Sequence, residues 1–340
     1  MEFVLAKAPT RVDLVGGTLD LTCLQQVLDH KATVNVGINL PATVKASIAN
    51  SGWDISSVDQ GSGFTGDWQA LMKSQTLPLA TLVLKHIWNQ KLPPLKIVME
   101  GKSPKGAGIG GSSALAIALF RALEAVKREL AGGDFLPESE LVRTVQDIET
   151  RLIWSPTGCQ DYWGAVRGRV NILNYEPGLV RVTTVNPAQL ENLEARLILC
   201  YSGKSRDSSL NNWAIFRRVF DGDKQIVQSL NNIGELAEKA AASVLKGDWD
   251  SLVSCSKEEW QLRKQLWPDI ATPETEKIDS LSKSFGATFS RVCGAGGGGV
   301  VAVFCDPAKK DTIAKSLAEH SIQVLSTGIA RSGLEISYGK

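Results

Sequence analysis

The sequence predicts an α+β protein of two lobes, and three observations lead to this prediction. The chain has 340 residues, which is enough for a large core and most naturally for two domains. Segments with strand periodicity and segments with helix periodicity are mixed along it. Between residues 185 and 195 the sequence turns loop-like, so we place the boundary there and expect domains at 1–190 and 191–340.

The first domain is expected to open with strands and to continue with helices and strands. Pro9 separates two short strands at 2–8 and 12–15. Residues 32–48 alternate apolar and polar side chains and are rich in β-branched residues, which favours the two strands of a hairpin. Helices are expected around 66–90, at about 112–131 and at about 137–153, and further strands at 95–100, 169–174 and 179–184.

The second domain is expected to begin with a strand at 195–203 and to be mostly helical from 207 to 285. It then ends with a strand, a glycine-rich loop at 294–299, a second strand, a helix and a last strand. Predicted helices that are grouped between strands, without repeated βαβ units, are typical of the α+β class.

Composition excludes several classes of protein. The formal charge of +1 provides no field that would attract nucleic acid or an anionic membrane, so neither is expected as a partner. The N-terminus lacks the pattern of a signal peptide, and no apolar run approaches the ~18 residues of a membrane span, which favours a cytoplasmic protein. Six scattered cysteines suit free thiols, and three distant histidines give little support to a zinc site or a Ser-His-Asp triad.

A glycine-rich run, GAGIGG at residues 106–111, lies between a predicted strand and a predicted helix. It satisfies G-x-G-x-x-G, as residues 294–299 also do, but such a match alone is weak. Dinucleotide binding is disfavoured because the surrounding sequence does not repeat βαβ units. The GKS sequences at 101–103 and 203–205 lack the upstream glycine that a P-loop requires.

What remains is a loop whose backbone N–H groups can approach a phosphate at the start of a helix. The helix is expected to start near Ser112, where its positive dipole end favours an anion. Ser112 and Ser113 would supply a cap and a hydroxyl group for Mg²⁺ or a phosphate oxygen. A plain glycine-rich turn with a serine N-cap is the alternative.

Three separated stretches, taken together, favour the phosphate-binding loop over the plain glycine-rich turn. They are KAPTRVDLVGGTLDL at 7–21, KGAGIGGSSALAIA at 105–118 and CGAGGGGVVAVF at 293–304. Their order and spacing resemble the GHMP kinase superfamily, named for galactokinase, homoserine kinase, mevalonate kinase and phosphomevalonate kinase, along nearly the whole chain. PTGCQDYWGAVRGRVNIL at 156–173 and YSGKSRDSS at 201–209 resemble the sugar branch of heptose 7-phosphate kinases and fucokinases.

The resemblance implies a fold and an activity. The fold would be a ribosomal-protein-S5-like N-terminal lobe and a ferredoxin-like C-terminal lobe, with ATP and the acceptor between them. The activity would be Mg²⁺-dependent transfer of the γ-phosphoryl group of ATP to a hydroxyl of a sugar or sugar phosphate, with the anomeric hydroxyl expected. The residues that would bind ATP are Lys105, Gly106, Ala107, Gly108, Ile109, Gly110, Gly111, Ser112 and Ser113.

Four residues match the catalytic and metal-binding positions of the family. Asp161 matches the catalytic aspartate, and it would take the proton of the acceptor hydroxyl as general base. Arg11 matches the basic residue beside it and would stabilise negative charge on the reacting oxygens. Glu149 lies twelve residues before Asp161 and suits the magnesium carboxylate, with Ser113 as the second protein ligand. An exposed helix face is the alternative for Glu149.

The acceptor is expected to lie beside Asp20, whose carboxylate can accept hydrogen bonds from neighbouring hydroxyl groups. Here the sequence departs from galactokinase, because Gly17 and Thr18 replace a glutamate and a histidine, which puts galactose in doubt. The residues expected to bind the acceptor are Thr18, Asp20, Gly158, Asp161 and Arg206.

Two other functions stay open at this point. One is a kinase for a non-sugar alcohol such as mevalonate, whose carboxylate a basic residue like Arg206 or Lys204 would favour. The other is a non-catalytic sensor that binds sugar and ATP, although the four catalytic and metal-binding residues argue against it. Either a monomer or a homodimer is compatible with the sequence.

Overall fold

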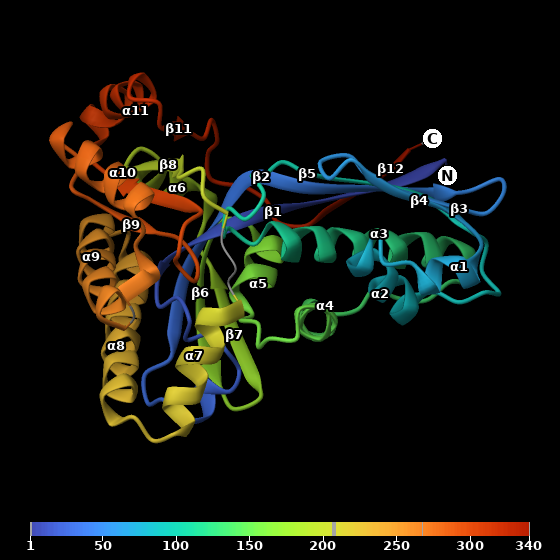
Figure 1. Ribbon diagram of the computed structural model, residues 1–340, viewed down its shortest axis with the longest axis horizontal. Helices are drawn as coiled ribbons and strands as arrows, with labels where there is room; N and C mark the ends of the chain where they lie inside the picture. The colour runs from blue at the N-terminus through green and yellow to red at the C-terminus, as the bar shows by residue number, and fades with distance from the viewer. Residues whose placement is uncertain (1, 206–208, 267, 340) are drawn as a thin grey trace.

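The computed structural model describes residues 2–205, 209–266 and 268–339, and it has the mixed α+β architecture that the sequence predicts (Figure 1). An eight-stranded sheet has the order β12-β1-β2-β5-β3-β4, and β6 and β7 continue from another part of β2. Its strands are β1 (Phe3–Val15), β2 (Ala32–Ile48), β3 (Trp53–Ser57), β4 (Ser62–Gly66), β5 (Leu95–Gly101), β6 (Val170–Glu176), β7 (Leu179–Thr184) and β12 (Glu335–Gly339).

Two long strands replace the four short ones that the sequence predicts at the start of the chain. β1 is continuous through Pro9, and β2 is one strand rather than a hairpin. The β1–β2 register shifts between the pairs Ala8–Ala42 and Thr10–Ile38, so Pro9 and Pro41 lie at an irregularity where a missing N–H costs little. Both predictions were wrong: a proline at a bulge does not end a strand, and alternation with β-branched residues at 32–48 is equally compatible with one long strand.

β2 changes its partner along its length. Its first part pairs with β6 through residues 32–36, and its last part pairs with β5 through residues 42–48. Between these two parts the chain leaves β5 at Gly101 and enters the glycine-rich loop and helix α3 (Gly111–Ala131). The break in the sheet therefore positions the loop.

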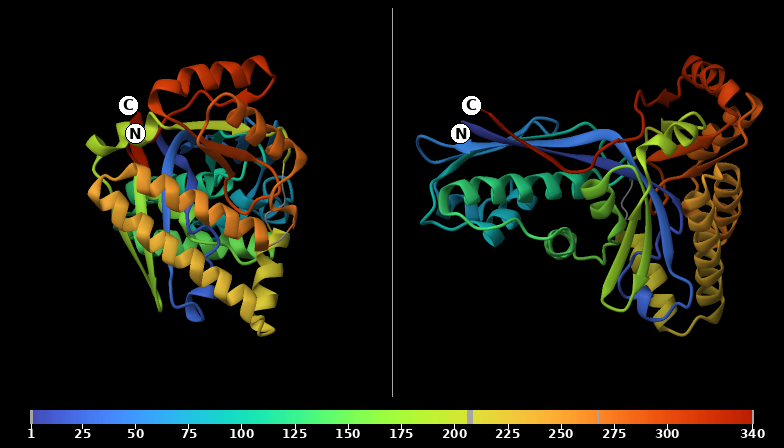
Figure 2. Two further views of the ribbon diagram at one scale, coloured as in Figure 1. Left: turned by 90° about the vertical axis from the view of Figure 1, so that its left-hand side faces the viewer. Right: turned by 180° about the vertical axis from the view of Figure 1, so that it is seen from behind.

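In Figure 1, helices lie below the eight-stranded sheet and cover that face of it. α3 packs against β1, β2 and β5 and runs along the length of the sheet (Figure 2). The helix expected at 66–90 is wrong as one element, because a break after Lys73 divides it and a second helix begins at Pro78. The other helices of this part are α1 (Trp68–Lys73), α2 (Pro78–Ile87), α4 (Glu138–Ile153), α5 (Gln160–Arg167) and a short turn, η1 (Leu24–Gln26).

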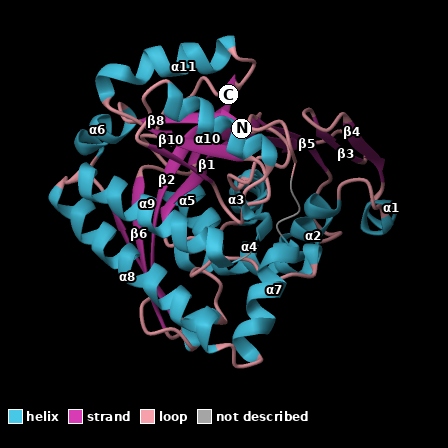
Figure 3. Ribbon diagram, turned by 60° about the vertical axis from the view of Figure 1, so that its left-hand side comes forward, coloured by secondary structure: helices cyan, strands magenta, loops and turns pink. Residues whose placement is uncertain are grey.

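The second sheet is antiparallel and has the order β11-β8-β10-β9, and the long helices come between β8 and β9 in the sequence. This is the strand order of a ferredoxin-like βαββαβ unit, which confirms the fold expected for this part. Figure 3 labels the strands β8 and β10 of this sheet together with the helices α8, α9, α10 and α11. Its strands are β8 (Leu197–Tyr201), β9 (Phe289–Val292), β10 (Val300–Phe304) and β11 (Gln323–Val324). Its α-helices are α7 (Ser209–Phe220), α8 (Lys224–Lys246), α9 (Trp249–Leu266), α10 (Pro273–Ser284) and α11 (Lys310–Glu319).

Short helices occupy the region predicted as a loop between the domains, η2 (Pro187–Gln189) and α6 (Leu190–Glu194). Two further short turns are η3 (Pro268–Ile270) and η4 (Pro307–Lys309). The last strand, β12, returns to the first sheet and pairs with β1, which brings the two ends of the chain side by side (Figure 1). Among the described residues, no helix is both long and apolar enough to cross a membrane.

Candidate active site

A cavity of about 630 Å³ lies beside the break in the first sheet. Its lining comes from the turn after β1, from the glycine-rich loop and α3, from the end of α4, from α5 and from the loop before β10. Segments that are more than 100 residues apart in sequence therefore meet there, and they include all three stretches that resemble the GHMP kinases.

The glycine-rich loop lies along β1 and ends in α3. Gly106, Gly108 and Gly110 have φ angles of +67°, +73° and +72°, which favour glycine. The backbone N–H of Arg11 donates to the carbonyl oxygen of Ile109 at 2.9 Å, and this bond fixes the loop against the strand. The loop thus presents backbone to the cavity at the start of α3, which is the arrangement that suits an anion.

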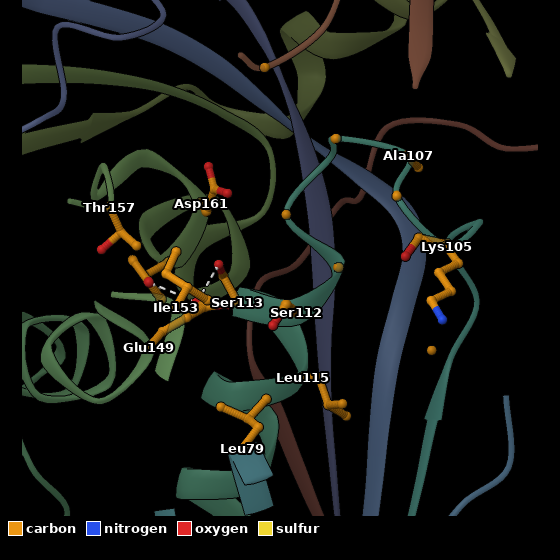
Figure 4. A pocket seen from close by; sticks show the side chains of 18 of the residues that line it. Leu79, Lys105, Ala107, Ser112, Ser113, Leu115, Glu149, Ile153, Thr157 and Asp161 are labelled. Atoms are coloured by element: carbon orange, nitrogen blue, oxygen red, sulfur yellow. Dashed lines mark hydrogen bonds between the residues drawn. The ribbon is translucent and has the colours of Figure 1, made fainter. Parts of the chain in front are cut away.

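α3 begins one residue before the predicted position, and its N-cap is Gly110 rather than a serine. Among the described residues no side-chain hydrogen bond caps this helix, so the capping role expected for Ser112 and Ser113 is wrong. Ser113 instead donates its hydroxyl hydrogen to Oε2 of Glu149, at 2.8 Å (Figure 4). Ser112 lines the cavity beside it.

Glu149 projects from α4 toward the start of α3, and it is not part of an exposed helix face, because only 6% of it is exposed. The hydroxyl of Tyr162 also donates to its Oε2, at 2.7 Å. Burial raises the pKa of Glu149, while the hydrogen bonds from Ser112, Tyr162 and Ser113 oppose that shift. A carboxylate and a serine hydroxyl therefore lie in contact at the end of the glycine-rich loop.

Asp161 and Arg11 form an ion pair at the centre of the cavity. Asp161 lies in the first turn of α5, where the helix dipole favours a carboxylate, and the Arg11 side chain is 4% exposed. Nη1 of Arg11 also donates to the carbonyl oxygen of Gly108, at 3.0 Å. Burial alone would lower the pKa of Arg11, but the carboxylates of Asp161, Asp13 and Asp20 outweigh it and raise the pKa. Arg11 and Asp161 therefore lie next to each other, as expected from the sequence.

The turn after β1 brings Thr18 and Asp20 into the cavity beside the start of α5. The carboxylate of Asp20 accepts a hydrogen bond from the backbone N–H of Gln160 at 3.1 Å, and a β-bridge joins Leu21 to Gly158. A side chain on Gly158 would overlap the Asp20 carboxylate. Burial and then the charge of Asp161 raise the pKa of Asp20 to about 6.

Three residues that were expected from the sequence to bind ATP or the acceptor are not placed together with these side chains. Lys105 lines the cavity but is exposed, and it lies apart from Asp161 and Ser113 in Figure 4. Ile109 is fully buried in the core, and it contributes its backbone carbonyl to Arg11 rather than a side chain to the cavity. Arg206 lies outside the described residues.

Sequence reasoning missed other residues of the cavity. Gln160 and Tyr162 flank Asp161 and hold Asp20 and Glu149, and their position next to the proposed base could have identified them. The cavity also has apolar lining residues: Leu77 and Leu79 at the start of α2, Met99 of β5 and Leu115 of α3, which no sequence motif connects. The second glycine-rich loop closes the cavity through Gly294 and Ala295, and Val300 N–H donates to the Ala107 carbonyl oxygen at 2.7 Å.

Comparison with known proteins identifies the family. Residues 77–169 match the GHMP kinases N terminal domain, and residues 224–323 match the GHMP kinases C terminal domain. The chain belongs to the GHMP kinases. Both lobes of the structure are accounted for by this family, and so is the mixed α+β fold.

The curated relatives of this GHMP kinase are themselves phosphotransferases. D-glycero-alpha-D-manno-heptose 7-phosphate kinase from Campylobacter jejuni is 25% identical over 74% of this chain and 76% of its own length. Mevalonate kinase from Thermococcus sibiricus is 25% identical over 98% of both chains. A solved structure of a D-glycero-D-manno-heptose 1-phosphate kinase from Bacteriodes thetaiotaomicron superposes with a TM-score of 0.79, at 20% identity, over 99% of both chains. The protein is thus an enzyme of phosphoryl transfer.

Proposed function

We propose that this GHMP kinase transfers the γ-phosphoryl group of ATP to a hydroxyl of a sugar or sugar phosphate, at the anomeric position. The observation that carries the proposal is the Arg11–Asp161 ion pair, which lies between the glycine-rich loop and Asp20 in one cavity. A phosphate donor and a polyhydroxy acceptor would therefore meet at a carboxylate that can take a proton.

The nucleotide would occupy the part of the cavity along the glycine-rich loop. Backbone N–H groups and the start of α3 suit the phosphates, because both present partial positive charge. The side chains of Leu79, Met99 and Leu115 continue the cavity with an apolar wall. An aromatic base fits such a wall better than a polyhydroxy acceptor does.

Mg²⁺ fits the donor set beside the loop, because it prefers oxygen ligands and takes few of them from protein. Ser113 and Glu149 would hold it, and both oxygens line the cavity. When bound, Mg²⁺ neutralises negative charge on the phosphates of the nucleotide. Tyr162 keeps the Glu149 carboxylate in place from the buried side.

Replacing Ser113 by alanine is expected to raise the Mg²⁺ concentration for half-maximal activity at least about tenfold, since even residues that only orient metal ligands have effects of this size. The KM of the acceptor should change much less, because Ser113 lies on α3, away from Asp20. Titrating Mg²⁺ at fixed ATP and fixed acceptor measures both effects. An unchanged Mg²⁺ dependence would exclude Ser113 as a ligand.

On the acceptor side, Asp161 would remove the proton of the attacking hydroxyl, and Arg11, which pairs with its carboxylate, would stabilise negative charge on the transferred group. Asp20 would accept hydrogen bonds from two neighbouring hydroxyl groups and so orient the sugar ring. The similarity to the Campylobacter jejuni heptose 7-phosphate kinase supports a sugar as the acceptor.

The raised pKa of Asp20 predicts a pH dependence. With a pKa of about 6, Asp20 gains its charge, and its full capacity to accept hydrogen bonds, as pH rises from 5 to 7, so kcat/KM for the acceptor should increase over this range. Asp20→Asn should remove this component of the profile. The free energy of unfolding is expected to change with pH in the opposite direction. Because the pKa of Asp20 in the folded protein lies above the ordinary value of 3.8, Asp20 stabilises the fold only at low pH, and that contribution is lost as pH rises toward 6.

Unfolding by urea at several pH values measures the predicted change in the free energy of unfolding, independently of the kinetics. Relative to the wild type, Asp20→Asn should gain stability as pH rises from 4 to 7. A pH-independent difference, together with an unchanged kcat/KM profile, would contradict a titrating Asp20.

Phosphorus NMR of the product tests the proposed position. We expect a single phosphoester whose phosphorus couples to the anomeric proton when free sugars and sugar phosphates are offered with Mg·ATP. Mevalonate belongs in the same assay, because the mevalonate kinases align over nearly the whole chain. Phosphorylation of mevalonate alone would replace the proposal by that second function, and phosphorylation at another hydroxyl would overturn the anomeric assignment.

A further inference from the structure

Four charged side chains form a fully buried cluster behind the cavity, and none of the functions above uses it. They are Asp13 of β1, Glu259 and Arg263 of α9, and Arg291 of β9, each with no exposed side-chain surface. α9 packs against both strands, so the cluster joins the two parts of the chain (Figure 1). Two carboxylates and two guanidinium groups balance in charge.

The carboxylates and guanidinium groups of this cluster lie in contact with one another. Oδ2 of Asp13 accepts from Nη1 of Arg263 at 3.1 Å and from Nη2 of Arg291 at 2.9 Å. Burial opposes ionisation of Asp13, but Arg291, Arg263 and Arg11 together lower its pKa to about 2. A buried ion pair is weak support for stability by itself, because desolvation offsets much of the attraction. The alternative to a stabilising role is that the cluster fixes the position of the segments that it contacts.

Arg263 differs from the other arginine of the cluster, Arg291, in the residues that it contacts. Its Nη2 donates to the carbonyl oxygen of Gly294 at 2.7 Å and to Oγ1 of Thr18 at 3.5 Å. Thr18 and Gly294 both line the cavity. Thr18 also has a φ angle of +81°, which a β-branched residue adopts only when its surroundings hold it there.

We propose that Arg263 is a positioning residue for the acceptor. It holds the turn that carries Thr18 and Asp20 in register with the second glycine-rich loop, and Asp13 completes the connection by accepting from the N–H of Gly294. The side chain itself does not reach the cavity. The proposal rests on the proposed function for its kinetic part, because the turn concerned is the one assigned to the acceptor.

Arg291 offers a matched control inside the same cluster. Among the described residues its guanidinium donates to the Leu14 carbonyl oxygen, Ser256, Glu259 and Asp13, and these residues do not line the cavity. Replacing either arginine by lysine keeps the charge and removes the fork of parallel donors. R263K and R291K should therefore destabilise the protein to a similar extent while only R263K disturbs the acceptor turn.

The kinetic test compares these two variants with the wild type. For R263K we expect the KM of the acceptor to rise at least tenfold while the KM of ATP stays within threefold. For R291K both values should stay within threefold even though its melting temperature falls. Equal acceptor KM values for the two variants, or a wild-type acceptor KM for R263K, would overturn the proposal.

Backbone hydrogen exchange tests the same claim without turnover, so it separates this proposal from the proposed function. Peptides covering residues 16–24 and 293–299 should exchange faster in R263K than in R291K at equal distance below the melting temperature. If R263K does not fold, Thr18→Val replaces it, since this change removes the Oγ1 acceptor and keeps the shape of the side chain. Unchanged exchange in these peptides would overturn the positioning role, whereas inactivity of the wild type toward every acceptor would overturn only the proposed function.

Discussion

Replacing Asp161 by asparagine is expected to lower turnover by about 10²- to 10⁴-fold while the affinity for ATP stays near the wild-type value. The amide cannot take the proton of the acceptor hydroxyl, and Arg11 loses the charge that it pairs with in the buried centre of the site. The loop that would bind the phosphates keeps its own contacts, since Arg11 still donates to the Gly108 carbonyl. Initial rates and equilibrium binding of Mg·ATP measure the two parts separately.

Thermal unfolding provides the control for this variant. Leaving the guanidinium of Arg11 buried without its partner destabilises the protein, so rates must be compared well below the melting temperature. Turnover within a few-fold of the wild type would exclude Asp161 as the general base, and loss of ATP binding in parallel with turnover would place its role in nucleotide binding instead.

The second large effect is expected at Gly158. An alanine Cβ at this position would overlap the Asp20 carboxylate, so the carboxylate must move away from the backbone N–H of Gln160. A displacement of about 1 Å at a substrate-orienting group can cost about 10²-fold in rate, and we expect a loss of that size in kcat/KM for the acceptor. The KM of ATP should be nearly unchanged, because the atoms nearest to the added Cβ belong to Asp20 and not to the glycine-rich loop.

A double-mutant cycle shows whether Gly158→Ala acts through Asp20. In an Asp20→Ala background the overlapping carboxylate is gone, so adding the alanine at position 158 should cost little more. Strictly additive effects of the two substitutions would show that the glycine matters for another reason, such as the bridge between Gly158 and Leu21.

The sequence predicted the centre of the candidate site better than the sheet around it. The proximity of Arg11 to Asp161 and of Ser113 to Glu149 was implied by the resemblance to the GHMP kinases, which rests on short stretches that are recognisable without knowing the fold. β1 was divided wrongly because Pro9 favours a break between strands, whereas in the sheet it lies at a shift of register. β2 was divided wrongly because alternation at 32–48 does not distinguish a hairpin from one long strand. The missed strands β3 and β4 are short, and β4 alternates only partly exposed side chains.

The buried cluster could not be predicted from one sequence. Asp13 and Arg291 are 278 residues apart, and each looks like an ordinary surface charge in its own segment. Charged residues are mostly exposed, so local pattern places all four at the surface. Only the packing of α9 between β1 and β9 brings them together and connects them to Thr18 and Gly294.

The central claim is that this GHMP kinase uses ATP to phosphorylate a sugar, and acceptor-dependent release of ADP tests it most directly. The assay takes the wild-type protein with Mg·ATP and compares free sugars, sugar phosphates, inositols, mevalonate and homoserine with a blank that holds no acceptor. We predict that ADP release rises above the blank with a sugar or sugar phosphate, and that Asp161→Asn abolishes the rise. A protein that binds ATP but releases no more ADP with any sugar or sugar phosphate than in the blank would contradict the claim.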